Sequence, residues 1–431
     1  MPSVPAARAP TLPLPIRAAN LGARWARAFG IEPVRLDEEG LLRDAARATG
    51  LEDFGPEPFQ GPLRRVLASL ESEARLTWLG RSIVRRELLR LLRNRLRLVA
   101  TWREHPEIER VEVHRPLVVV GLPRTGSTVL HDILARDPAH RAPLTWECNE
   151  PCPPPDARSF DSDPRIAPCD AELAGVDKLI PGFKAMHPMG ARLAQECVVL
   201  MQHTMCSVLF HNEYHVPRYQ DWLDEPDFDW GPIYAFHRHL LQHLQWRCAR
   251  ERWVLKTGAH MWSLDQLLAT YPDACIVQTH RDPVKVATSY ASLTTLVRAM
   301  SSDRVDPFEV AADWTPRLAR ALDRAADVRD SSRFAAERFH DVHFPALLAD
   351  PMKIVEEIYG RFDFELTGEA ADRMRQFVEQ NPQGKHGVHR YAPAEYGLDV
   401  ATERKRFARY TDRFGIEPEP EGPLSGRVRD L

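Results

Sequence analysis

The residues with the clearest chemical meaning form the run Gly121-Leu122-Pro123-Arg124-Thr125-Gly126-Ser127-Thr128. They lie between an apolar run, residues 116–120, that predicts a buried strand and a segment, residues 128–135, that predicts a helix. In such a turn the backbone N–H groups at the start of the helix point at one anion. Gly126 allows close approach of the backbone, and Ser127 and Thr128 add hydroxyl donors. We therefore expect a phosphate-like anion at this turn.

The spacing of this loop resembles the nucleotide-binding pattern Gly-x-x-x-x-Gly-Lys-Ser/Thr, with one important difference. Ser127 stands where that pattern has its lysine, and the cation lies inside the loop instead, at Arg124. The sequence also has no apolar strand that ends in an aspartate suited to magnesium. These features indicate an anion that is bound without a metal.

Residues 123–128 resemble the 5′-phosphosulfate loop of the sulfotransferases, whose usual form is Pro-Lys/Arg-Ser/Thr-Gly-Thr/Ser-Thr. Sulfotransferases also hold the 3′-phosphate of the donor with an arginine at a strand end and a serine eight residues later. Arg281 and Ser289 match that second pattern, because Arg281 follows the predicted strand 274–279 and Ser289 lies on the helix that opens at Pro283.

The resemblance covers about residues 114 to 415 and is closest to the bacterial sulfotransferases. The segments 253–256, 271–274 and 391–398 are also similar to that group. It implies a sulfotransferase that takes a sulfuryl group from 3′-phosphoadenosine 5′-phosphosulfate (PAPS) and needs no metal. The implied PAPS-binding residues are Arg124, Thr125, Gly126, Ser127, Thr128, Arg281 and Ser289.

Four charged residues are predicted at the carboxyl ends of strands, where ligands bind in a parallel sheet. They are Arg124, Glu147, Lys256 and Arg281, with Glu147 placed at the end of an expected strand 141–146. Sulfuryl transfer needs a base for the acceptor proton and cations for the developing charge. The resemblance implies Glu147 as the base, and we expect Arg124 and Lys256 to stabilise the bridging and sulfuryl oxygens.

Two further residues compete for the role of base. His260 follows Lys256 by four residues, whereas the cytosolic sulfotransferases have a histidine two residues after the matching lysine. Glu196 lies in an apolar segment, where burial would raise the pKa of its carboxyl group and suit it to proton transfer. His187, near the expected acceptor region, is better explained as a plain loop residue.

Other polar groups have simpler explanations. His237, His239 and His243 share one predicted helix, which favours a polar stripe over a metal pair. Cys148 and Cys152 lack a second ligand pair at zinc spacing. The basic segment 384–390 resembles the loop that closes on the nucleotide in sulfotransferases, with Lys385 and Arg390 as candidate phosphate contacts, although a solvated basic loop is the simpler explanation.

The elements that must position these residues alternate between strands and helices. This pattern predicts an α/β protein with a P-loop-like three-layer fold, in which a parallel sheet lies between helices, plus a helical N-terminal extension. The expected divisions are a flexible N-terminus (1–16), the extension (17–110) and the sulfotransferase domain (111–431), with 150–232 as the acceptor-site insertion. Helices are predicted over residues 195–210 and 233–250, among others, and a strand over 339–344.

Composition narrows the class of protein. The net charge of −4 argues against a main role in holding nucleic acid or an anionic membrane, and the basic run 81–97 fits a solvated helix face. No apolar stretch of 18 residues predicts a membrane span, and no signal peptide is found. Seven scattered cysteines fit reduced thiols, so we expect a cytoplasmic protein.

The sequence therefore favours a PAPS-dependent sulfotransferase acting on a hydroxyl or amine of a small acceptor. Aromatic residues hint at an apolar or aromatic acceptor: Phe160, Phe183, Phe210, Tyr214, Tyr219 and Trp222. We expect no nucleic-acid partner and no stable membrane insertion. The sequence allows a homo-oligomer and does not decide the oligomeric state. The alternatives are a P-loop kinase, which the absent lysine disfavours, and a non-catalytic nucleotide-binding protein.

Overall fold

The computed structural model describes residues 14–56, 59–179, 189–331, 333–381 and 392–419. Its centre is a five-stranded sheet in the order β2-β3-β1-β4-β5, in which every neighbouring pair of strands is parallel. The strands are β1 (Leu117–Val120), β2 (His140–Arg141), β3 (Arg252–Lys256), β4 (Cys275–His280) and β5 (Phe339–His343). This confirms the predicted α/β class and parallel sheet.

Strand β1 lies between β3 and β4, so the chain crosses to the opposite half of the sheet after β3. Val119 pairs with Lys256 on one side and Val120 pairs with Gln278 on the other. The segments that follow β1, β3 and β4 therefore leave the sheet at the same edge. In open α/β sheets such a switch point is where ligands bind.

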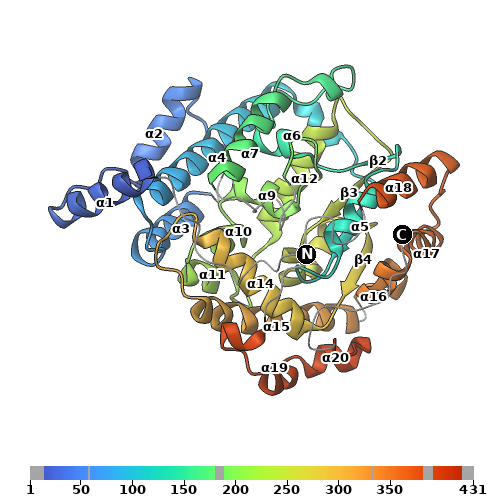
Figure 1. Cartoon of the computed structure of the whole chain (residues 1–431). Coiled ribbons are helices and arrows are strands. Elements are labelled where there is room, and N and C mark those ends of the chain that lie inside the picture. The colour runs from blue at the N-terminus through green and yellow to red at the C-terminus, as the bar shows by residue number, and fades with distance from the viewer. Residues whose placement is uncertain (1–13, 57–58, 180–188, 332, 382–391, 420–431) are drawn as a thin grey trace.

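The helices before β1 form the N-terminal extension, on the opposite side of the molecule from α16, α17 and α18 (Figure 1). They are α1 (Leu14–Ala28), α2 (Glu38–Thr49), α3 (Gln60–Ser72), α4 (Trp78–Glu104) and the 3-10 turn η1 (Pro106–Arg110). Arginines of the basic run in α4 bind carboxylates: Arg81 with Glu71, Arg85 with Asp44, and Arg90 with Glu87. The basic run is thus a helix with its own acidic partners.

The helices between β1 and β3 include the helix that follows the anion loop and the expected acceptor region. They are α5 (Ser127–Leu134), α6 (Thr145–Asn149), η2 (Phe160–Ser162), α7 (Ile166–Leu179), α9 (Cys197–Met201), η3 (Gln202–Thr204), α10 (Leu209–Glu213), α11 (Pro217–Leu223) and α12 (Gly231–Gln245).

The remaining helices follow β3, β4 and β5. They are η4 (Gly258–Trp262), α13 (Leu264–Thr270), α14 (Pro283–Arg298), α15 (Pro307–Asp330), η5 (Ala336–Arg338), α16 (Phe344–Ala349), α17 (Pro351–Phe362), α18 (Gly368–Gln380), η6 (Pro393–Tyr396), α19 (Val400–Arg406) and α20 (Ala408–Phe414). None of the helices in the described ranges combines the length and the apolar character needed to cross a bilayer.

Two buried clusters lie on opposite faces of the sheet. Val118 and Leu255 belong to the larger cluster, which also holds side chains of α2, α3 and α4. Leu117 and Val119 point to the other face, where they pack with residues of α5, α17 and α18. This alternation follows from the two-residue repeat of a strand. The N-terminal helices therefore share one core with the sheet.

Two details of the sequence prediction are wrong. The expected strand over 141–146 is only the two residues of β2, and Glu147 lies on helix α6 instead of at a strand end. The expected helix over 195–210 is broken into α9, η3 and α10, with Met205 at a positive φ of 59° between them. Apolar composition predicted burial there, but short helices bury such residues as well as one long helix does.

Candidate active site

The loop after β1 is shaped by three residues with positive φ. Gly121 has φ 135°, Arg124 has φ 69° and Gly126 has φ 86°. A Cβ at position 121 would lie 2.4 Å from the Oγ1 atom of Thr279, and a Cβ at position 126 would lie 2.8 Å from Cδ2 of Leu347. Glycine is therefore required at both positions by conformation and by space.

Thr125 fixes the loop from inside. Its hydroxyl donates to the carbonyl oxygen of Leu122 at 2.7 Å and lies 2.6 Å from the hydroxyl of Thr279 on β4. The Thr125 side chain is buried, so its hydroxyl shapes the loop. Helix α5 then begins at Ser127, and the free N–H groups of its first turn provide the anion-binding end of the loop.

The two predicted anion cradles, which are the loop 121–128 and the pair Arg281 and Ser289, are in contact. An Nη1–H of Arg281 donates to the carbonyl oxygen of Arg124 at 2.9 Å, and Nε–H of Arg124 donates to Oγ of Ser289 at 3.2 Å. Arg281 follows β4, and Ser289 lies on α14. Residues from three parts of the chain thus converge at one edge of the sheet.

A carboxylate from the end of the described chain lies on the Arg281 fork. The oxygens of Glu419 accept from Nε and Nη2 of Arg281 at 2.7 and 3.0 Å, and the backbone N–H of Glu419 donates to Asp282 at 2.8 Å. An arginine fork binds a carboxylate and a phosphate with the same two parallel bonds. Glu419 therefore occupies an anion position beside the loop, and no sequence pattern connects two residues so far apart.

Lys256 is a buried cation beside the loop. Its ammonium group donates to Oε1 of Glu196 at 2.6 Å and to the hydroxyl of Thr128 at 3.2 Å. The other carboxylate oxygen of Glu196 accepts from the hydroxyl of Thr257 at 3.0 Å. Glu196 immediately precedes α9, and its side chain is about one-third exposed. A carboxylate that solvent reaches is thus held beside a cation and the first turn of the anion-binding helix.

Glu147, the base expected from the resemblance, lies in different surroundings. It is fully buried, and Arg141 donates to both of its carboxylate oxygens at 3.2 and 2.8 Å. The backbone N–H of Leu144 binds the same carboxylate at 2.8 Å. Burial raises the pKa of Glu147, and Arg141 opposes this shift. These bonds hold α6 in place, and the Glu147 side chain is closed to solvent.

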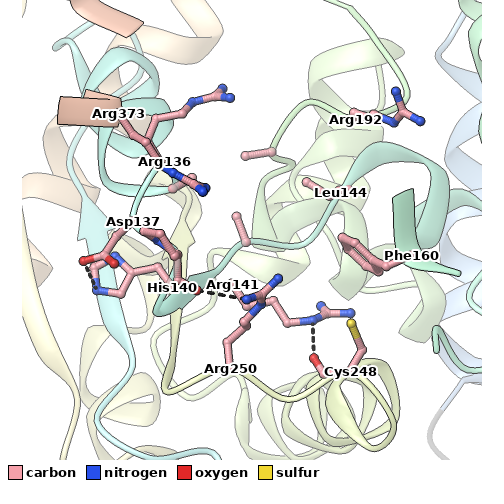
Figure 2. Close-up of a pocket in the computed structure, with 14 residues that line it drawn as sticks. Arg136, Asp137, His140, Arg141, Leu144, Phe160, Arg192, Cys248, Arg250 and Arg373 are labelled. Atoms are coloured by element: carbon pink, nitrogen blue, oxygen red, sulfur yellow. Dashed lines mark hydrogen bonds and ion pairs between the residues drawn. The ribbon is translucent and has the colours of Figure 1, made fainter. Parts of the chain in front are cut away.

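Arg141 is itself fixed beside a hollow of about 190 Å³ (Figure 2). Its Nε–H donates to the carbonyl oxygen of Cys248 at 3.0 Å. Arg136, Arg250 and Arg373 also line this hollow. The hollow adjoins the last turn of α5, whereas the anion loop is at the first turn, so the two sites are distinct.

His260 is buried in η4. Its Nδ1 atom lies 2.8 Å from the hydroxyl of Tyr234, and burial keeps its pKa well below the ordinary value. This one hydrogen bond connects the His260 side chain to the core helix α12.

Asp132 is a nearby acidic residue that the sequence analysis missed. It lies one helical turn after Thr128 on α5, and burial raises the pKa of its carboxyl group to about 6, with Lys256 opposing this shift. The four-residue spacing from Thr128 is the signal that places both residues on one helix face. Glu213 at the end of α10 also has a raised pKa, to about 8, because of burial.

The three helical histidines each have a separate partner. His237 hydrogen-bonds the hydroxyl of Tyr271, His239 stacks on the Trp102 ring, and His243 binds the carbonyl of Pro151. Within the described ranges, no group of three or more His, Cys, Asp or Glu side chains is arranged to hold a metal ion. The predicted residues His187, Lys385 and Arg390 lie outside the described residues.

Comparisons with known proteins show which chains this one resembles. The chain is similar to the omega-hydroxy-beta-dihydromenaquinone-9 sulfotransferase Stf3 of Mycobacterium bovis and of Mycobacterium tuberculosis, at 26% identity over 334 residues, which cover 72% of this chain and 79% of the relative. The similarity to the crystal structure of sulfotransferase STF1 from Mycobacterium tuberculosis H37Rv has 34% identity and a TM-score of 0.78, over 87% of this chain and 99% of that one.

Sulfotransferase STF9 from Mycobacterium avium is similar at 29% identity with a TM-score of 0.82, over 90% of this chain and 99% of that one. The sequence profile of the sulfotransferase family matches residues 116–368, which begin just before β1 and extend to the start of α18. Since this match spans more than half of the chain and includes both anion cradles, the chain belongs to the sulfotransferase family.

Proposed function

We propose that this sulfotransferase uses PAPS as its donor and transfers the sulfuryl group to a hydroxyl of a small apolar acceptor. The observation that supports this most is the contact between the two cradles, in which Arg281 donates to the carbonyl oxygen of Arg124. Anion sites that lie next to each other suit one adenylate-type molecule with an anionic group on the 3′ and the 5′ position of its ribose. The family and the named relatives support the same chemistry.

The chain's residues fit such a donor. The loop around Gly126 leaves no room for a side chain and offers the N–H groups of α5, which suits the 5′-phosphosulfate. Arg281 and Ser289 would take the 3′-phosphate. Since Glu419 binds two of the donor atoms of Arg281, a phosphate must displace this carboxylate to bind there.

The reaction breaks the S–O bond to the donor phosphate and forms a new S–O bond to the acceptor oxygen, while the acceptor loses one proton. Lys256 and Arg124 would stabilise the negative charge that builds on the leaving phosphate and the sulfuryl oxygens. We assign the role of base to Glu196, because its carboxylate lies 2.6 Å from Lys256 and is reached by solvent. The acceptor proton moves to a carboxylate oxygen of Glu196.

Glu147 then has a positioning role. Its bonds to Arg141 and to the backbone of Leu144 fix the segment 143–146. That segment pairs with the chain leading to Glu196, because Gln195 N–H donates to the carbonyl of Pro143 at 2.7 Å. Glu147 therefore acts on the reaction only through the placement of Glu196.

The acceptor is proposed from the relatives and not from aromatic content. Stf3 is named for a hydroxylated dihydromenaquinone, so a hydroxyl on an apolar molecule is the acceptor class to test first. Of the aromatic residues that hinted at this class, Phe210, Tyr214 and Tyr219 are buried in the main cluster.

A donor-dependent assay tests the proposal. The full-length protein is incubated with PAPS and a panel of hydroxylated apolar molecules, including quinols, and the products are screened by mass spectrometry for the added mass of SO3. We expect at least one acceptor to gain this mass only with PAPS present. Donor binding without transfer to any acceptor would favour the non-catalytic alternative, and magnesium-dependent turnover of ATP would favour the kinase alternative.

A further inference from the structure

Exposed apolar side chains are concentrated at the N-terminal end of the described chain. Seven large hydrophobic residues are exposed in the described ranges, and five of them fall within residues 14–31. These five are Leu14 (75% exposed), Leu21 (55%), Trp25 (64%), Phe29 (77%) and Ile31 (62%). A soluble surface normally carries such residues singly, so this grouping indicates a contact surface.

The exposed residues of α1 share one face of the helix. At 100° per residue, Leu21 and Trp25 lie within about 20° of the direction of Leu14. The opposite face holds the helix to the protein: Ala23 is buried, Asn20 accepts from the N–H of Leu79, and Arg27 donates to the carbonyl of Leu76. Helix α1 lies at the edge of the molecule in Figure 1 and packs against α4.

The charge of this segment is also one-sided. The first 31 residues contain four arginines (8, 17, 24 and 27) and no Asp or Glu, although the whole chain has a net charge of −4. On α1, Arg17 and Arg24 border the apolar face by the same angular rule. Arg24 has an acidic neighbour, Asp303, at 3.8 Å, and both side chains are more than half exposed. Surface pairs of this kind exchange readily with other anions.

We propose that α1 and the following residues 29–31 bind the surface of an anionic lipid bilayer. Leu14, Leu21 and Trp25 enter the boundary between headgroups and acyl chains, and Arg17 and Arg24 bind lipid phosphates. A helix with an apolar Leu/Trp face and an arginine-lined border is typical of interfacial binding. Tryptophan prefers this boundary because its ring is apolar and its N–H is polar.

Charge distinguishes a lipid surface from a second copy of the chain. An isologous antiparallel pair of α1 helices places both arginine rows on the same side, where they repel each other. Affinity for an anionic bilayer instead rises with every arginine, by roughly fivefold for each. The proposal concerns only the surface of α1 and does not depend on which donor or acceptor the site uses.

Vesicle flotation tests this surface with the full-length protein. Vesicles of phosphatidylcholine alone are compared with vesicles that contain phosphatidylglycerol. We expect wild-type protein to float with the anionic vesicles, and this binding to weaken as salt is added. The double variant Trp25→Glu with Leu21→Glu should lower vesicle binding more than tenfold. The double variant Arg17→Glu with Arg24→Glu should lower it by a similar factor, because each lost arginine weakens binding by roughly fivefold.

The matched control is Phe308→Glu, which changes an exposed aromatic residue outside the segment and should leave flotation unchanged. Circular dichroism and thermal melting check that each variant folds. Failure of the wild-type protein to bind anionic vesicles, or equal binding by the Trp25/Leu21 variant, would overturn the proposal. A wild-type dimer that the same variant converts to a monomer in sedimentation would assign the surface to a second copy instead.

Discussion

Two adjoining segments, residues 143–147 and 191–196, each carry one glutamate and place it in opposite surroundings. The segments are joined by backbone bonds from Trp146 to Ala191 and from Gln195 to Pro143. Glu147 is buried and forms an ion pair with Arg141, whereas the partly exposed Glu196 forms an ion pair with Lys256. In the proposed mechanism, the position of the nearest cation distinguishes the structural carboxylate of Glu147 from the reactive carboxylate of Glu196.

The cation partners of the two glutamates lie at different places in the sheet. Arg141 lies in β2, at the edge of the sheet, and its guanidinium packs over the Trp253 ring. Lys256 is the last residue of β3, beside the central strand β1, so its side chain reaches the anion loop. A buried ion pair stabilises the fold only when both partners remain, whereas a partly exposed one can exchange a proton with a ligand.

The largest expected effect is on turnover by Glu196→Gln. The amide keeps the shape of the side chain but cannot accept the acceptor proton, so kcat should fall about 10²–10⁴-fold. Affinity for adenosine 3′,5′-bisphosphate should stay close to wild type. The melting temperature should fall less than for Glu147→Gln, because the Glu196 side chain is about one-third exposed. Steady-state kinetics with PAPS, calorimetry and thermal melting provide the three readouts.

Glu356→Gln is the control, since Glu356 is exposed on α17, in the layer on the far side of the sheet. Full turnover by the Glu196 variant would contradict the assignment of Glu196 as the base. Another acidic residue near Lys256 would then be the candidate.

Glu147→Gln is expected to change stability instead of chemistry. It leaves Arg141 charged, buried and without its carboxylate, which costs about 3–5 kcal/mol in the free energy of unfolding. Urea denaturation measures this loss, and kcat per folded molecule should change far less than in the Glu196 variant. Arg141→Met with Glu147→Leu removes both charges and should recover most of the stability. A stable but inactive Glu147→Gln enzyme would contradict the positioning role.

Glu419→Gln should raise donor affinity, by about tenfold. The neutral amide binds the Arg281 fork more weakly than the carboxylate does, so the 3′-phosphate displaces it more easily. Calorimetry with adenosine 3′,5′-bisphosphate measures the change. Glu417→Gln removes the same charge from an exposed side chain two residues away and should have no effect. Weaker binding by the Glu419 variant would indicate that this carboxylate supports the donor site.

The smallest expected effect is the pH dependence of stability at Asp132. The pKa of its carboxyl group is raised to about 6 in the fold, above the ordinary value of 3.8, so the folded protein loses stability as pH rises between these values. Asp132→Asn removes this cost and should gain about 1 kcal/mol above pH 6, after allowance for partial exposure. At pH 4 the variant and the wild type should melt alike. An equal difference at both pH values would contradict this origin.

The sequence predicted the placement of the proposed donor-binding residues better than that of the proposed base. The loop 121–128 and Arg281 lie at strand-to-helix junctions, where local pattern and parallel topology decide the geometry. Glu147 and Glu196 are placed by segments that pair across 50 residues, and Glu419 reaches Arg281 from 138 residues away. No local pattern encodes such contacts, so the choice between the carboxylates needed the three-dimensional structure.

The most direct test of the account is calorimetric titration of adenosine 3′,5′-bisphosphate into the wild type and into Arg124→Ala and Arg281→Ala. Charged hydrogen bonds are worth about 1.5–3 kcal/mol each, so each variant should bind about 10- to 150-fold more weakly. Arg250→Ala, which changes an exposed arginine of the separate hollow beside β2, should bind like the wild type. Wild-type affinity in both cradle variants would contradict the claim that the two cradles hold one donor.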